Sequence, residues 1–282
     1  MKFLFQSKKL LVVAILAASA LQVRADSFFW AINQFTTVQK INGDTGAVVD
    51  SFAYTGAGSG ASIAVVGNIG YQTGLGNANV YGVDMTTHAS LGIMFNTGNS
   101  SSMNSITNDV NGHLWFGHGG GGAGNELQEF DTSGTLLSTH TWPTVSGSYR
   151  DGLVVYGGKV VANRGDQQGP YDQYAIGANN TALTYLASPF ITAFGGNNGI
   201  AFNGTNFYVS NEQTHIVTKY DASGAFVSQA NLGANTRYEN WTFASQDIDV
   251  DVNKVPENTS TLALLSLSVF GMLIVRQRRN AA

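Results

Sequence analysis

The chain has 282 residues, of which 34 are glycine, 4 are proline and 11% are charged, and it contains no cysteine. The missing cysteine excludes a disulfide framework, a thiolate metal site and a cysteine nucleophile, and glycine without a three-residue period excludes collagen. A hydrophobic share of 43% is enough for a buried core.

The first 25 residues have the outline of a secretory signal peptide. Basic residues precede an apolar stretch at 10–21, and small residues lead to a cleavage point between Ala25 and Asp26. The alternative is a retained membrane helix, which the short apolar stretch disfavours. We therefore expect signal peptidase to remove residues 1–25.

The body, residues 26–254, contains short apolar or alternating runs separated by glycine and asparagine, a pattern typical of all-β proteins. An apolar or aromatic residue followed by Asp or Asn, usually with a glycine shortly after, recurs along the body. These marks fall at 42, 84, 131, 175 and 221, with a degenerate copy at 175. A turn glycine recurs with the same period, at Gly67, Gly112, Gly157 and Gly204.

A period in the mid-forties with about four short strands per repeat indicates propeller blades. In the clearest repeat, 199–232, we expect strands at 200–202, 207–210, 216–220 and 225–231. The first repeat lacks its first strand, and residues 241–252 continue past the fifth, so these two segments would share a blade and close the ring. The prediction is a five-bladed β-propeller, with six blades, one eroded, as the alternative. The repeat pattern is similar to that of NHL-type propellers, a resemblance that brings no catalytic residues.

The histidines indicate no metal site. His113 and His118 lie five apart across an expected strand, on opposite faces if it is regular, and we expect His88, His140 and His215 to be exposed. The glycine-rich stretch 118–125 lacks the lysine and hydroxyl of a phosphate loop, so we interpret it as a loop between strands.

Other charged groups are candidates for a site at the ring entrance. An alternative function, a secreted propeller hydrolase or lyase, would use His113, His118, Arg150, Asp151, Arg164 and Asp166. Three further carboxylates alternate along one expected strand and are weak calcium candidates without a bending glycine: Asp247, Asp249 and Asp251. We predict no metal and no cofactor, and interpret these three as a solvated strand face.

The C-terminal segment reads as a single hydrophobic helix, predicted over about 259–275, between a Val255-Pro256-Glu257 tripeptide and a basic cluster. The cluster consists of Arg276, Arg278 and Arg279. The helix would be a minimal membrane span with the arginines on the cytoplasmic side.

This arrangement over residues 255–282 resembles the PEP-CTERM sorting signal of Gram-negative bacteria. The resemblance implies that exosortase, a membrane transpeptidase, recognises Val255, Pro256 and Glu257 and that the body reaches the cell surface or extracellular matrix. An exopolysaccharide or another surface protein is then the expected partner. The commonest form of the family continues with a second proline, and Asn258 stands at that position here, which we expect to affect the efficiency of processing. The alternative to a sorting signal is an ordinary C-terminal membrane anchor.

The charge of the chain divides unevenly between its parts. The whole chain has 14 basic and 18 acidic residues, whereas the body alone has 7 basic and 17 acidic residues, a net charge of −10. This disfavours nucleic acid as a partner. The leading interpretation is a non-enzymatic, exported propeller with a binding or structural role.

Overall fold

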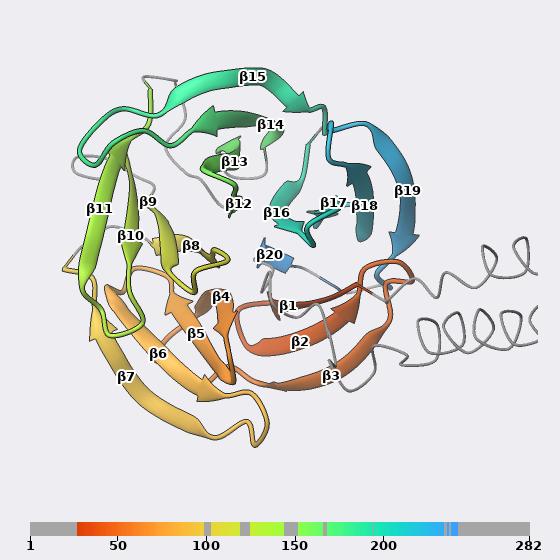
Figure 1. Ribbon diagram of the computed structural model, residues 1–282. Coiled ribbons are helices and arrows are strands. Elements are labelled where there is room, and N and C mark those ends of the chain that lie inside the picture. The colour runs from red at the N-terminus through yellow and green to blue at the C-terminus, as the bar shows by residue number, and fades with distance from the viewer. Residues whose placement is uncertain are drawn as a thin grey trace, which may run out of the picture.

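The structure is a computed structural model that describes residues 27–98, 103–118, 125–143, 152–165, 168–193, 195–233, 236 and 238–241. Within these residues every helix-or-strand element is a β-strand, and the strands form five four-stranded antiparallel sheets arranged in a ring (Figure 1). The five-bladed prediction is therefore confirmed over six blades. No helix in the described ranges is long and apolar enough to cross a membrane, and the predicted span at 259–275 lies outside them.

In each blade the four strands lie side by side, the first at the centre of the ring and the fourth at its outside (Figure 1). Blade 1 contains β20 (Tyr238–Trp241), β1 (Phe28–Asn33), β2 (Thr37–Asn42) and β3 (Val48–Ala53). Blade 2 contains β4 (Gly60–Val66), β5 (Ile69–Gly74), β6 (Asn79–Asp84) and β7 (Ser90–Asn96). Blade 3 contains β8 (Met103–Asn108), β9 (Leu114–His118), β10 (Glu126–Phe130) and β11 (Leu136–Thr141).

The last two blades follow the same order. Blade 4 contains β12 (Leu153–Tyr156), β13 (Lys159–Gly165), β14 (Gln168–Ala175) and β15 (Thr184–Ile191). Blade 5 contains β16 (Asn197–Phe202), β17 (Asn206–Asn211), β18 (Ile216–Asp221) and β19 (Phe226–Asn231). The four strands expected in the repeat at 199–232 are thus present, with ends shifted by at most three residues.

The hydrophobic core lies between the blades. Successive side chains of a strand point to opposite faces of its sheet, so Phe29 and Ala31 of β1 pack toward blade 5, whereas Trp30 and Ile32 pack toward blade 2. The same division gives five buried clusters, one at each junction between neighbouring blades. The inner strand β4 of blade 2 is therefore buried on both faces, from Gly60 to Val65.

The recurring Asp or Asn of the repeats anchors the turn between the third and fourth strands of a blade. In blade 5, Asp221 Oδ1 accepts hydrogen bonds from the backbone N–H groups of Ser223 and Ala225, at 2.8 and 3.0 Å. Gly224 in this turn has a φ of +84°, in the left-handed region that favours glycine. The predicted turn chemistry is confirmed.

The C-terminal strand closes the ring, as predicted. β20 pairs antiparallel with β1 and supplies the innermost strand of blade 1, with Ala31 opposite Trp241 and Asn33 opposite Tyr238. The closing strand begins at Tyr238, three residues earlier than expected. Residues 242–254 of the predicted body lie outside the described residues.

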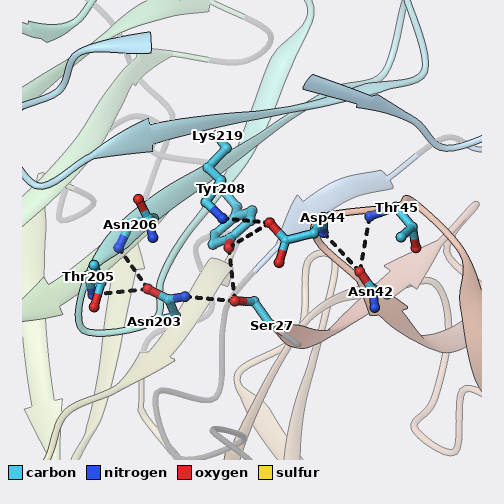
Figure 2. A network of polar contacts seen from close by, with 9 residues as sticks. All are labelled: Ser27, Asn42, Asp44, Thr45, Asn203, Thr205, Asn206, Tyr208 and Lys219. Carbon is cyan, nitrogen blue, oxygen red and sulfur yellow. Dashed lines mark hydrogen bonds and ion pairs between the residues drawn. The ribbon is translucent and has the colours of Figure 1, made fainter. Parts of the chain in front are cut away.

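A partly buried polar network also joins blade 5 to blade 1 (Figure 2). Lys219 Nζ lies 2.5 Å from Asp44 Oδ1, and the Tyr208 hydroxyl donates a hydrogen bond to Ser27 Oγ at 2.9 Å. Burial by itself lowers the pKa of Lys219, but the contacts with Asp44 and Tyr208 outweigh it and raise the pKa. The lysine therefore stays charged and holds the first and last blades together.

Candidate functional site

A pocket lies between blades 3 and 4 on one face of the ring. Because neighbouring strands are antiparallel, the turns between first and second strands and between third and fourth strands leave on the same face, which we call the hairpin face. The pocket has a volume of 370 Å³. Its lining is Asp109, Val110, Asn111, Trp115, Glu129, Val155, Tyr156, Gly157, Gly158 and Ile176.

Asp109 is fixed at the turn between β8 and β9. Its Oδ1 accepts hydrogen bonds from the backbone N–H groups of Asn111 and His113, at 2.9 and 3.0 Å. Its Oδ2 accepts a hydrogen bond from Trp115 Nε1 at 3.2 Å. Both carboxylate oxygens are thus oriented by groups of the same blade.

His113 and Glu129 meet beside this carboxylate. The pairing of β9 with β10 sets Glu129 opposite Trp115, which places the Glu129 carboxylate near the start of β9. His113 Nδ1 then lies 2.7 Å from Glu129 Oε1 and 3.9 Å from Asp109 Oδ2. One ligand atom from each of the three residues lies within 4.8 Å of the other two.

Ser138 of β11 contacts Glu129, and His140 of the same strand contacts Ser138. The Ser138 hydroxyl donates a hydrogen bond to Glu129 Oε2 at 2.6 Å, and His140 Nε2 lies 3.2 Å from Ser138 Oγ. Because the serine proton is used on Glu129, the network assigns His140 as the donor in the second bond. The His140 ring also stacks on Trp115, with centroids 6.2 Å apart.

The expectation that His88, His140 and His215 are exposed was wrong. His140 is only 2% exposed, and burial lowers its pKa. His88 is half-buried and stacks on Phe52 at 4.2 Å, and His215 Nδ1 lies 2.5 Å from the carbonyl oxygen of Thr236. Contacts with residues outside the local turn or strand, such as Trp115, Phe52 and Thr236, bury the three histidines at least in part, and single repeats do not reveal these contacts.

The candidate entrance residues that the structure describes do not converge. Arg164, near the end of β13, donates hydrogen bonds to both carboxylate oxygens of the buried Asp172, at 2.7 and 2.9 Å, and one to Ser188. His113 lies in the β8–β9 turn, at the opposite face of the ring. His118 ends β9, and its side chain lies outside the description. The other entrance candidates, Arg150, Asp151 and Asp166, are outside the described residues.

Further predicted residues also lie outside the described ranges: the calcium candidates Asp247, Asp249 and Asp251, the cleavage point at Ala25 and Asp26, the tripeptide Val255, Pro256 and Glu257, and the cluster Arg276, Arg278 and Arg279. Sequence reasoning missed Asp109 and Glu129. A signal for Asp109 was present, because an Asp two residues before an Asn-Gly pair is typical of an anchored turn.

Comparison with protein-family models and with curated proteins finds no match. Comparison with solved structures finds many matches, among them three at low sequence identity. A chain of a nidogen/laminin complex has a TM-score of 0.47 and 16% identity, covering 80% of this chain and 88% of that one. The computationally designed Ika4 protein has a TM-score of 0.40 and 11% identity, covering 59% of this chain and 93% of that one. A chain of the mitotic checkpoint complex has a TM-score of 0.42 and 10% identity, covering 77% of this chain and 65% of that one. The five-bladed assignment rests on the sheet topology itself.

Proposed function

We propose that this chain is an exported propeller that binds a ligand in the pocket between blades 3 and 4. The observation that carries the proposal is the pocket itself, a 370 Å³ hollow with a mixed apolar and acidic lining. Such concave sites with a few polar groups are the usual form of a binding site. The proposal assigns no catalytic step.

The two ends of the chain support export. Residues 1–25 have the features of a cleaved signal peptide, and residues 255–282 resemble the PEP-CTERM sorting signal. We propose that signal peptidase removes the first segment and that exosortase processes the second at Val255, Pro256 and Glu257. The propeller is then held at the cell surface or in the extracellular matrix.

The pocket lining favours a hydroxyl-rich ligand, for which the matrix exopolysaccharide is our candidate. The carboxylates of Asp109 and Glu129 accept hydrogen bonds, and Tyr156 offers a half-buried aromatic surface. The acidic body, with a net charge of −10 from 7 basic and 17 acidic residues, disfavours polyanions such as nucleic acids.

One fractionation experiment tests export and binding together in an exosortase-bearing host that produces an exopolysaccharide matrix. Wild-type chain should be recovered in the matrix. The double substitution Pro256→Ala with Glu257→Ala should leave it in the membrane fraction, and unchanged localisation would overturn the sorting proposal.

The second arm places a large side chain at the pocket mouth. Val110 is 76% exposed and lines the pocket, so Val110→Arg should fold normally, leave the membrane and fail to be retained by the matrix. The matched control is Val227→Arg on the outer strand β19, where valine is also exposed. Equal matrix retention of the two variants would overturn the assignment of the pocket.

A further inference from the structure

We propose that Asp109, His113 and Glu129 bind a divalent transition-metal ion of the zinc class at the edge of the pocket. This goes beyond the proposed function, because export and retention in the matrix require no metal. The three residues come from the β8–β9 turn and from β10, and the fold alone brings them together.

The distances between the ligand atoms suit a small divalent ion. Zinc binds nitrogen and oxygen ligands at about 2.0 to 2.2 Å, so tetrahedral ligand atoms are about 3.3 to 3.6 Å apart. The observed separations from His113 Nδ1, 2.7 Å to Glu129 and 3.9 Å to Asp109, lie on either side of that range. Small side-chain adjustments would therefore complete the site.

The chemistry of the ligands narrows the class of metal. One imidazole nitrogen with two carboxylate oxygens is a set that zinc and neighbouring transition metals accept, whereas calcium takes six to eight oxygens. Three protein ligands leave at least one coordination position for water or for a ligand. Since Asp109 and Glu129 both line the pocket, that position is accessible from it.

Hydrogen bonds from neighbouring side chains fix the orientation of the two carboxylate ligands. Trp115 Nε1 donates a hydrogen bond to Asp109 Oδ2, and the Ser138 hydroxyl donates one to Glu129 Oε2. A carboxylate oxygen has two lone pairs, so Asp109 Oδ2 retains one for a metal. Such supporting hydrogen bonds orient metal ligands and tune affinity.

The direct test is calorimetric titration of the processed, chelator-treated chain with zinc chloride. Wild type should bind one zinc per chain, and His113→Gln, which removes a half-exposed ligand, should weaken binding at least tenfold. His88→Gln is the matched control, since His88 lies outside the cluster beside Asp50. The absence of zinc binding by wild type, or equal losses in the two variants, would overturn the proposal.

Ser138→Ala provides a second test that leaves all three ligands in place. Because Ser138 is a positioning residue, its substitution should weaken zinc affinity by about tenfold while the stoichiometry stays at one zinc per chain. Binding of calcium but not zinc would overturn the transition-metal assignment. The zinc titration contains no exopolysaccharide and matrix retention is measured without added zinc, so the pocket-ligand and metal proposals fail separately.

Discussion

At the scale of single residues, His140 shows how a buried polar side chain is tolerated in a blade. It hydrogen-bonds to Ser138 and stacks on Trp115, and it is 2% exposed. Burial is the main cause that lowers its pKa, while the nearby Glu129 charge opposes the shift. His140 therefore stays neutral in the folded protein at a pH where the unfolded chain already takes up a proton.

The sign of this shift predicts acid sensitivity. An unfolded histidine has a pKa of about 6.5, so the contribution of His140 is complete above that pH and is lost as the pH falls through the folded-state value. Urea unfolding should show the free energy of unfolding decreasing from pH 7 to pH 5. His140→Gln should reduce that decrease, measured with chelator present. If His88→Gln reduced the decrease in the free energy of unfolding equally, burial of His140 would not be the cause of that decrease.

At the scale of elements, Gly46 and Gly224, each in the turn between the third and fourth strands of a blade, allow close packing on the neighbouring blade. A Cβ on Gly224 would lie 2.3 Å from the carbonyl oxygen of Phe190, on the outer strand of blade 4. A Cβ on Gly46 would lie 2.2 Å from the carbonyl oxygen of Asn231, on the outer strand of blade 5. The same glycine therefore permits a positive φ and a close approach between neighbouring blades.

This double role predicts unequal costs for the same substitution. Gly224→Ala should lower the free energy of unfolding by about 2 to 4 kcal/mol, because backbone strain and a backbone clash add. Gly204 has a similar φ of +87° and open space around it, so Gly204→Ala should cost about 1 kcal/mol. Urea denaturation of both variants measures the difference. Equal costs would show that contact between blades does not require the glycine.

The repeat could be read from the sequence because local chemistry marks it. Asp221 and Gly224 form a turn within five residues, and such turns recur at the blade period. The candidate site could not be read in this way. Glu129 reaches His113 only through the pairing of β9 with β10, a contact that depends on register rather than on local pattern.

At the scale of the whole molecule, stability depends on closing the ring. β20 pairs with β1, and Tyr238 is buried in the cluster between blades 5 and 1, where its hydroxyl donates a hydrogen bond to Gln39. The network of Lys219 and Asp44 joins the same two blades nearer the outside (Figure 2). The first and last strands therefore stabilise each other although they lie at opposite ends of the body.

Ending the chain after Gly233 should therefore abolish cooperative unfolding, whereas ending it after Lys254 should preserve it. The shorter chain loses β20, leaves β1 as an open inner edge and uncovers the cluster between blades 5 and 1. Tryptophan fluorescence during urea unfolding should show a sigmoidal transition for the longer chain and a shallow slope for the shorter one. Tyr238→Phe in the longer chain is the control, since it keeps the strand and removes one hydrogen bond at a cost of about 1 kcal/mol. A shorter chain that unfolds with the same midpoint and steepness would mean that four blades and three strands are sufficient for the fold.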